Sequence, residues 1–444
     1  MTRLGDDAAI LARLRAAVPV NVRAVCETLA SAGHQAVTVG GAVRDALLGR
    51  TPGDWDVATA ARPEQVMALF KRTVPTGLQH GTVTIVTGRG EDSHVEVTTF
   101  RGEGAYTDAR RPDHVTFGVP LVEDLARRDL RVNAMAYDPA ADQLIDPYAG
   151  RRDLEDRMLR AVGPTGDVYA DAVARFSEDG LRVMRAVRFA AVLEFALDPD
   201  TERGIRPALP SLAKVSRERV SDELRKILAT REPSRALAIA ERTGIIELTL
   251  PELARGFDAW AAIRGDRAAA VAHWLARVDR AVGTARLPAM MLELASPTPA
   301  HRLDRDAVKR AQATLRGLKF SNDELVGAGI LVGSANATLV AEWTAAQLRR
   351  LLADITRAHA ATAVALWRGD GAALAEPAAT IVERGDPLAA GELAVTGGDL
   401  ISELALTPGP VVGKLIASLV DRVLEDPALN TREQLVSIAR ELAT

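Results

Sequence analysis

Two patterns of hydrophobic and polar residues divide the chain. Between about residues 35 and 165, short runs rich in β-branched residues, such as QAVTVGG and HGTVTIVTG, alternate with helical pieces such as PEQVMALFK. From about residue 166 onward, Ala, Leu, Arg and Glu dominate at helical spacing. The pattern predicts an α+β fold in which a mixed sheet with helices precedes a purely helical region.

A glycine turn and two aspartates stand close together within GGAVRDALLGRTPGDWDV. In a strand the side chains alternate faces, so Asp54 and Asp56 would point the same way. Hard divalent cations such as Mg²⁺ take oxygen ligands and leave room for triphosphate oxygens. Gly40 and Gly41 would let backbone N–H groups approach those phosphates. A lone DxD is more often a solvated turn, but the order strand, turn, helix, strand favours a metal site.

Two further polar stretches could complete such a site. Glu96, in HVEVTTFR, could join or orient the metal site if its strand lies beside that of Asp56. In RRDLRVNAMAYD, the fork of Arg128 suits phosphate or ribose oxygens, and Asp129 could fix that fork or hold a ribose hydroxyl. Asn133 follows in the same stretch. The alternative is the charged end of a surface helix.

The stretch ARFSEDGLRVMRAVRFA predicts a helix that carries Asp179, Arg182, Arg185 and Arg188 on one face. Asp accepts and Arg donates, so the first two can match the base-pairing edge of cytosine or adenine. Uracil and guanine present a carbonyl instead of the amino group, which leaves the carboxylate unpaired at a cost of about 1–3 kcal/mol. The other two arginines would be free for phosphates or base stacking. A plain charged helix face is the alternative.

Composition and charge limit the classes of protein. With 444 residues, 48% hydrophobic and 26% charged, the chain has ordinary globular composition and predicts several domains. The formal net charge of −4 gives no overall basic field, so any nucleic-acid surface must be a local patch of arginines. The single cysteine, Cys26, excludes an internal disulfide and fits a reducing cytoplasm. We see no signal peptide, no membrane-length apolar run and no sign of an obligate protein partner, and expect a cytoplasmic protein.

Five motifs occur in a characteristic order across about residues 36–230: GGAVRDALLG with DWDVAT, RRDLRVNAMAYD, IDPYAGRRDL, EDGLRVMRAVRFA and SRERVSDELRKIL. Together they resemble the class II tRNA nucleotidyltransferases, the CCA-adding enzymes, and the related bacterial poly(A) polymerases. The resemblance implies a polymerase-β-like nucleotidyltransferase head followed by an all-α neck, body and tail. The expected divisions are an N-terminal helix at 1–34, head at 35–165, neck at 166–235, body at 236–345 and tail at 346–444.

The resemblance also implies roles for individual residues. Asp54 and Asp56 would bind Mg²⁺, Gly41 and Arg44 would contact the incoming triphosphate, and the aspartate and arginine of EDGLR would select the base in place of a template. The implied catalytic residues are Asp54, Asp56 and Glu96, and the implied nucleotide-binding residues are Gly40, Gly41, Arg44, Arg128, Asp129, Asn133, Asp179, Arg182, Arg185 and Arg188. The implied activity is addition of CCA to the 3′ end of tRNA from CTP and ATP, with tRNA bound at the tail.

Three narrower readings follow from the comparison of motifs. PTGLQHGTVTIV is similar to the CCA-adding type, whereas poly(A) polymerases tend to carry a GRRF-like run. FRGEGAYTDARRPDHVTFG is similar to the loop that full CCA enzymes use to switch from C to A, although separate CC-adding or A-adding activity stays open. Many relatives carry an HD phosphohydrolase domain, but here Leu292 and Glu293 stand where His and Asp would sit. We expect no phosphohydrolase activity and interpret His273 as a structural remnant.

Overall fold

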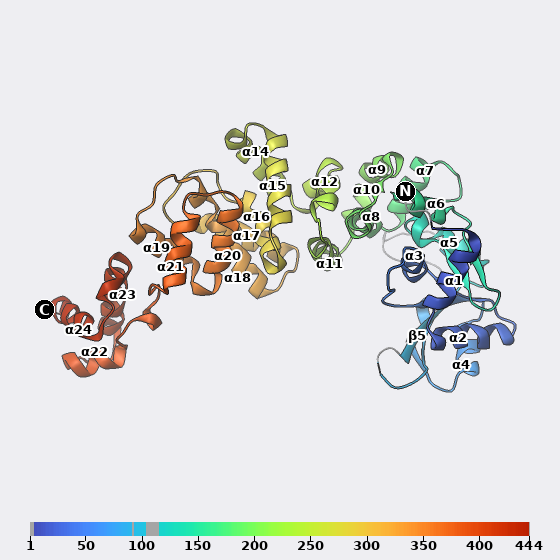
Figure 1. Cartoon of the computed structure of the whole chain (residues 1–444), viewed down its shortest axis with the longest axis horizontal. Coiled ribbons are helices and arrows are strands. Elements are labelled where there is room, and N and C mark those ends of the chain that lie inside the picture. The colour runs from blue at the N-terminus through green and yellow to red at the C-terminus, as the bar shows by residue number, and fades with distance from the viewer. Residues whose placement is uncertain (1–3, 91–92, 104–114, 444) are drawn as a thin grey trace. The chain divides into compact units, whose positions relative to one another are not determined.

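The computed structural model in Figure 1 describes residues 4–90, 93–103 and 115–443. Its contacts divide the chain into two compact units, Met1–Thr230 with Arg235–Thr249 and Arg231–Ser234 with Leu250–Thr444, here called unit 1 and unit 2. Most of the segment that resembles the switching loop lies outside the described residues. The finer division into neck, body and tail stays a prediction.

Unit 1 contains a mixed β-sheet. In the described residues seven strands form it in the order β3-β4-β5-β2-β1-β8-β9, and β2 and β5 are the parallel pair among antiparallel neighbours. The strands are β1 (Ala36–Val39), β2 (Asp56–Thr59), β3 (Thr73–Gly77), β4 (Thr82–Val86), β5 (His94–Thr99), β8 (Ala136–Asp138) and β9 (Gln143–Ile145). Two short pairs lie outside this sheet, β6 (Arg101–Glu103) with β7 (Val115–Phe117) and β10 (Met158–Leu159) with β11 (Ala196–Leu197).

The register of the central strands sets where the predicted carboxylates lie. All four residues of β1 are buried, as expected for a strand covered on both faces. Val39, the last of them, pairs with Asp56, and Val57 pairs with Val97 on the other side. Asp56 directly precedes Val57, and Glu96 directly precedes Val97. The two acids therefore occupy neighbouring positions on the parallel strands β2 and β5. The condition on which a role for Glu96 depends, that its strand lies beside that of Asp56, is therefore met.

Helices surround the sheet and continue beyond it in unit 1, where Figure 1 shows α7 to α10 gathered beside one another. They are α1 (Asp7–Ala17), α2 (Val20–Ser31), α3 (Gly41–Leu47), α4 (Pro63–Leu69), α5 (Leu121–Ala126), α6 (Gly150–Asp156), α7 (Val168–Glu178), α8 (Leu181–Leu193), α9 (Pro199–Arg203), α10 (Ile205–Leu212), α11 (Arg217–Leu228), α12 (Ser234–Arg242) and α13 (Ile245–Thr249). The N-terminal segment therefore holds two helices instead of the expected one. The reason is Pro19, whose missing N–H ends α1 and whose fixed φ suits the start of α2.

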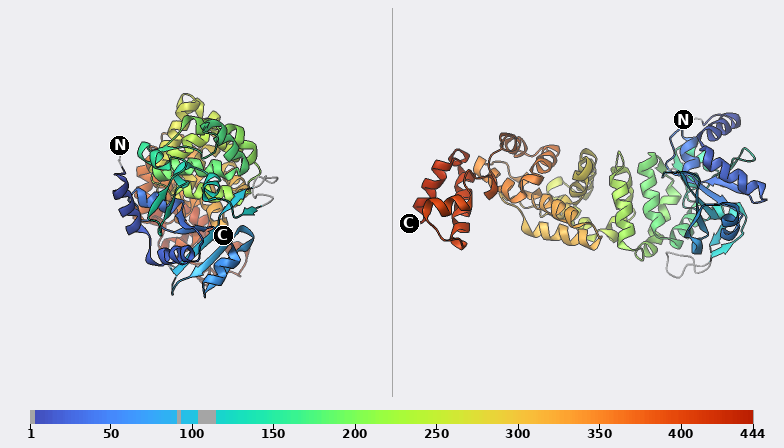
Figure 2. Two further views of the ribbon diagram at one scale, coloured as in Figure 1. Left: turned by 90° about the vertical axis from the view of Figure 1, so that its right-hand side faces the viewer. Right: turned by 90° about the horizontal axis from the view of Figure 1, so that it is seen from below.

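All regular secondary structure in the described residues of unit 2 is helical, as the sequence pattern predicts. Its α-helices are α14 (Pro251–Arg264), α15 (Arg267–Arg280), α16 (Arg286–Met291), α17 (Arg305–Gly317), α18 (Asn322–Gly333), α19 (Ala345–Ile355), α20 (Arg357–Gly369), α21 (Ala375–Arg384), α22 (Gly397–Leu404), α23 (Pro410–Glu425) and α24 (Arg432–Ala443). The last three share a small core around Leu400, Leu419 and Leu435, and appear in red beside the C-terminus in Figure 2. Among the described helices, none is long and apolar enough to cross a membrane.

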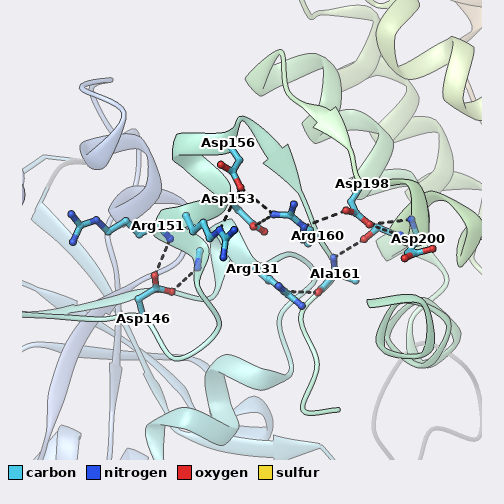
Figure 3. A network of polar contacts seen from close by, with 12 residues as sticks. Arg131, Asp146, Arg151, Asp153, Asp156, Arg160, Ala161, Asp198 and Asp200 are labelled. Atoms are coloured by element: carbon cyan, nitrogen blue, oxygen red, sulfur yellow. Dashed lines mark hydrogen bonds and ion pairs between the residues drawn. The ribbon is translucent and has the colours of Figure 1, made fainter. Parts of the chain in front are cut away.

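A network of aspartates and arginines joins α6 to the start of α9 (Figure 3). The guanidinium of Arg160 contacts the carboxylate of Asp153 on α6, and its Nε donates to Asp198 at 3.2 Å. Asp198 in turn caps α9 by accepting the N–H groups of its first turn. Asp146 accepts the N–H of Gly150 at 2.7 Å and caps α6 in the same way. The IDPYAGRRDL motif thus ties the sheet to the helices that follow it.

Burial makes Asp153 the unusual member of this network. The residue is 1% exposed and its Oδ2 atom has no hydrogen-bond partner. Burial raises the pKa of Asp153 to about 6, and Arg160 opposes this shift only in part because it also serves Asp198. The folded state therefore binds this proton more strongly than the unfolded state does.

We expect the contribution of Asp153 to the stability of unit 1 to be lost as the pH rises from about 4 to about 6, because the folded pKa of Asp153 lies above the unfolded value. Asp153→Asn cannot ionise and should remove this part of the pH dependence, about 3 kcal/mol between pH 4 and pH 7. Urea unfolding of both proteins across this range measures it. Glu155→Gln, on the same helix, should retain the wild-type pH dependence. Equal pH dependence in wild type and Asp153→Asn would contradict the prediction.

Candidate nucleotide-binding and catalytic site

A cavity of about 560 Å³ in unit 1 brings most of the predicted site residues together. It lies where the end of the sheet meets α8 and α11. Its lining comprises Gly41, Arg44, Asp56, Arg127, Arg128, Asp129, Asn133, Asp179, Leu181, Arg182, Arg185, Arg188, Phe189 and Arg219. Of the predicted residues, Gly40, Asp54 and Glu96 are not part of this lining in the described structure, and each adjoins a residue that is.

Asp56 begins β2 at the edge of the cavity and is exposed by its surface area, although its carboxylate is crowded by neighbouring groups. Burial of the carboxylate raises the pKa of Asp56, Arg128 lowers it, and the carboxylates of Glu96 and Asp54 raise it further. Glu96 and Asp54 are therefore each close enough to repel the carboxylate of Asp56. Asp54 itself precedes the strand, so the strand begins two residues later than the sequence pattern predicts.

Gly40 leaves space for the guanidinium of Arg128. Its φ of +78° is a conformation that side-chain-bearing residues rarely adopt, and a Cβ there would lie 2.5 Å from Nη1 of Arg128. That Nη1 donates to the backbone carbonyl of Asn133 at 3.4 Å, and burial lowers the pKa of Arg128. The positive φ therefore favours glycine here, and the absence of a Cβ lets the guanidinium of Arg128 lie against the turn.

Asp129 is a buried acceptor shared by three groups. It accepts from Nδ2 of Asn133 and from the backbone N–H of Leu130, both at 2.9 Å, and from Nε of Arg185 at 2.8 Å. Burial alone would raise the pKa of Asp129, but Arg185 and these hydrogen bonds hold it well below its usual range. Of the two roles expected for Asp129, the arginine fork that it holds is that of Arg185 on α8 instead of Arg128, and the contact with a ribose hydroxyl stays a prediction.

The predicted base-selecting pair does not lie on one helix face. Asp179 ends α7 with extended backbone angles, and Arg182 belongs to the first turn of α8. The break occurs because the Asp179 carboxylate accepts the N–H of Leu181 at 3.0 Å, which favours a cap over a continuous helix. Gly180 between them packs against α10, where a Cβ would lie 2.3 Å from backbone atoms. Nη1 of Arg182 donates to Glu178 at 2.7 Å.

Arg185 and Arg188 are ion-paired instead of free. Arg185 contacts Asp129, and Nε of Arg188 donates to Glu223 on α11 at 2.6 Å. Both guanidiniums also lie over the ring of Phe189, with their Cζ atoms 5.4 and 4.3 Å from its centroid, and that of Arg44 lies at 5.0 Å.

Four lining residues are missing from the sequence predictions: Arg127, Leu181, Phe189 and Arg219. The signal for Phe189 is an aromatic residue that directly follows a row of arginines, in a chain with only 4% aromatics. Arg219 lies within the SRERVSDELRKIL motif, but its proximity to Asp179 depends on the packing of α11 against α8. No pattern within the motif itself reveals that contact.

The acids of this site can supply some of the oxygen ligands of a cation, and the phosphates of a bound substrate and water would supply the others. Within residues 4–90, 93–103 and 115–443, no group of three or more His, Cys, Asp and Glu side chains has the arrangement of a metal site. Mg²⁺ usually binds one or two carboxylates together with substrate phosphates and water, so a full cage is not required. The repulsion of Asp56 by Asp54 and Glu96 is the electrostatic condition that a cation relieves.

Comparison with known proteins relates this geometry to a family. A poly A polymerase head domain model matches residues 36–160, an RNA and SrmB binding model of polymerase A matches 194–257, and a tRNA nucleotidyltransferase domain 2 model matches 305–439. The CCA-adding enzyme of Geobacillus thermodenitrificans is 38% identical over 412 residues, covering 91% of this chain and 92% of the relative. The chain belongs to the CCA-adding enzyme family. The resemblance carried by the five motifs is confirmed.

Further relatives and solved structures agree with the family assignment. The CCA-adding enzyme of Geobacillus stearothermophilus is 37% identical over 93% of this chain and 94% of its own. The crystal structure of the Bacillus stearothermophilus CCA-adding enzyme in complex with CTP superposes with a TM-score of 0.69 at 31% identity, over 95% of this chain and 97% of that one. The Thermotoga maritima CCA-adding enzyme complexed with tRNA, at 16% identity and a TM-score of 0.64, shares the fold.

An arginine network occupies the region compared with an HD domain. Arg277 on α15 is buried and pairs with Glu293 at 2.5 Å and with Asp370 at 2.9 Å. One of its Nη atoms lies 3.1 Å from Nδ1 of His273. Burial and then Arg277 lower the pKa of His273 to about 4, against the opposing effect of Asp370. His273 is therefore uncharged at neutral pH, in a network that holds helices of unit 2 together.

We expect Arg277→Ala to destabilise unit 2 by about 3–5 kcal/mol, because it leaves the carboxylates of Glu293 and Asp370 buried without their cation. Thermal unfolding followed by circular dichroism measures the change. Arg305→Ala, at a surface ion pair with Asp354, is the matched control and should shift stability by less than about 1 kcal/mol. A loss at Arg277 no larger than that of the control would show that the network does not stabilise the unit.

Proposed function

We propose that this chain adds the sequence CCA to the 3′ end of tRNA, using CTP and ATP and releasing pyrophosphate. The observation that carries the proposal is a single cavity that holds Asp56 together with Asp179 and Arg182. Asp56 would lie at the reacting phosphate, and Asp179 and Arg182 would contact the base of the same nucleotide. A site of this kind can select a nucleotide without a nucleic-acid template. Membership of the CCA-adding enzyme family and the likeness to an enzyme solved with CTP support it.

The arginines of the cavity suit the triphosphate. Arg44, Arg128 and Arg185 come from three different elements and face one space, so their donors can meet oxygens of different phosphates. In this proposal they hold the triphosphate while the tRNA 3′ hydroxyl attacks the α-phosphorus in line. The bond to the β,γ-diphosphate breaks, and pyrophosphate leaves with the charge that the guanidiniums stabilise.

Mg²⁺ held by Asp54 and Asp56 would supply positive charge at the reacting oxygens. The fold places Asp56 at the first residue of β2 and Asp54 two residues before it. The strand of Glu96 lies beside β2. Burial and the two neighbouring acids raise the pKa of Asp56, and Arg128 offsets only part of this effect.

Base selection is proposed for the other end of the cavity. Asp179 would accept the amino group of cytosine or adenine, and Arg182 would donate to the adjacent ring nitrogen. Glu178 and the backbone carbonyl of Arg175 hold the Arg182 guanidinium, at 2.7 and 3.1 Å. A guanidinium held in this way discriminates between bases better than a mobile one, because its side chain loses little conformational entropy when the nucleotide binds.

The cytoplasm is the proposed location. Cys26 is a free, buried thiol whose pKa burial raises to about 12, so it is protected from oxidation and consistent with a reducing compartment.

One assay tests the activity: purified protein, Mg²⁺, a tRNA that lacks its 3′ end, and CTP, ATP or both, with products sized on a gel. Addition of three nucleotides only when both are present is the expected result. Long A tails from ATP alone would identify a poly(A) polymerase. Products that stop after CC, or A addition only to a tRNA that ends in CC, would identify a split activity.

We expect Asp56→Asn to reduce nucleotide incorporation by about 10³-fold or more, because a loss of about 4 kcal/mol of charge stabilisation corresponds to that factor. Binding of tRNA should remain within a few-fold of wild type. Single-turnover incorporation and a tRNA gel-shift measure the two effects. Glu64→Gln, an exposed acid of the same unit, is the control. Wild-type incorporation by Asp56→Asn would exclude Asp56 from the reaction.

Asp179→Ala should relax the choice among the four nucleotides. Loss of one discriminating hydrogen bond of about 1–3 kcal/mol lowers the preference for CTP over UTP by roughly 5- to 150-fold. Competition between labelled nucleotides on a tRNA lacking CCA measures the ratio, with Asp200→Ala on the exposed surface of α9 as control. An unchanged ratio would remove Asp179 from base reading.

A further inference from the structure

We infer that Phe189 is a positioning residue for the triphosphate, which acts by holding the guanidinium of Arg44 in place against α8. The inference rests on the proposed function and extends it to a side chain that has neither a charge nor a polar atom. Phe189 lies on α8, is 7% exposed and lines the nucleotide cavity together with the arginines around it.

Arginines from two walls of the cavity meet at the ring of Phe189. The Cζ atoms of Arg188 and Arg185 lie 4.3 and 5.4 Å from the ring centroid, and that of Arg44 lies 5.0 Å from it. A guanidinium at this range is attracted by the negative face of an aromatic ring. The first two arginines share α8 with the ring, whereas Arg44 comes from α3, which follows the first strand of the sheet. The ring therefore joins the sheet side of the site to α8.

Other groups hold Arg44 only within the plane of its guanidinium. Nε and Nη2 donate to the two carboxylate oxygens of Asp45, both at 2.9 Å, and Nη1 donates to the side-chain oxygen of Asn133 at 2.5 Å. These bonds use three of the five N–H donors of an arginine, so two remain for phosphate oxygens. Bonds in the plane resist movement out of that plane only weakly. Phe189 supplies the constraint on the face of the guanidinium, which fixes where the two remaining donors point.

An aromatic ring suits this task because it attracts cations without a net negative charge. Asp129 and Glu223 already pair with Arg185 and Arg188, so the arginines of α8 are partly neutralised. A further carboxylate would repel the phosphates of the incoming nucleotide. The quadrupole of the Phe189 ring instead offsets the repulsion between the arginines of α8 and the one from α3, and it leaves the positive charge available to the ligand.

The alternative role for an aromatic side chain in a nucleotide site is to stack on the base. The ring of Phe189 is buried and has guanidiniums over it, so it offers little surface to a base. It also lies seven residues after Arg182 on the same helix, which is about 10 Å along the helix axis. In the proposed function Arg182 contacts the base, and Phe189 therefore belongs to the phosphate end of the cavity.

Phe189→Leu removes the ring and keeps an apolar side chain at this position. We expect the affinity for CTP, measured by equilibrium dialysis in the presence of Mg²⁺, to fall about tenfold, because the arginines that meet the triphosphate lose their common contact. The affinity for CMP and the preference for CTP over UTP should stay at their wild-type values. A loss that grows from CMP through CDP to CTP identifies an effect on the phosphates, which a general loosening of the cavity would not produce.

Phe195→Leu is the matched control. Phe195 is also buried in unit 1, and its ring lies 5.5 Å from Cζ of Arg157, outside the lining of the nucleotide cavity. This variant should bind all three cytidine nucleotides as wild type does. An unchanged affinity of Phe189→Leu for CTP, or an equal loss for CMP and CTP, would overturn the inference.

Ring fluorination separates the electrostatic contact from the shape of the side chain. Phenylalanine with increasing numbers of ring fluorines at position 189 keeps nearly the same shape, while each fluorine weakens the negative face of the ring. The affinity for CTP should fall stepwise along this series, which also gives the answer if Phe189→Leu does not fold. Wild-type affinity throughout the series would overturn the inference. Failure of wild type and Phe195→Leu to extend tRNA would instead reject the proposed function.

Discussion

The ion pair between Asp129 and Arg185 is the interaction on which the site depends. It joins the segment after α5, which packs on the sheet, to the middle of α8. Asn133 adds to it, since its amide donates to Asp129 and its side-chain oxygen accepts from Arg44. A buried carboxylate must be paired to be tolerated. Asp129 is paired with Asn133 on the sheet side of the cavity and with Arg185 on the α8 side. These contacts fix the position of α8 relative to the sheet.

This arrangement resolves a conflict of charges. A site for a triphosphate needs several arginines in a small volume, and such arginines repel one another in the absence of the ligand. Here Asp129, Glu178 and Glu223 each neutralise an arginine of α8, and the ring of Phe189 covers three guanidiniums. Near Asp56 the repulsion is between carboxylates, and the positive charge of Arg128 reduces it. The cavity is thus pre-formed because its charges are already paired.

Much of this could be predicted from the sequence, and the error at Asp179 and Arg182 has a local cause. Alternation of short apolar runs predicted the sheet, whereas the pairing of the strands of Asp56 and Glu96 was left as a condition that the structure meets. The helical face of Asp179 and Arg182 was wrong, because the aspartate caps α8 and the glycine after it is pressed against α10. Spacing rules assume a regular element. They fail where a short polar side chain competes with the backbone.

The sequence by itself determined which residue types are present, their order along the chain and the alternation of strand and helix, since these depend on local propensity and periodicity. It also carried the motifs that identify the family. Only the tertiary structure decided which charges pair: Arg185 with Asp129, Arg188 with Glu223, and Arg219 with Asp179, over separations of 56, 35 and 40 residues. Partners so far apart are chosen by the packing of α8 against the sheet and α11, and no local pattern encodes that choice.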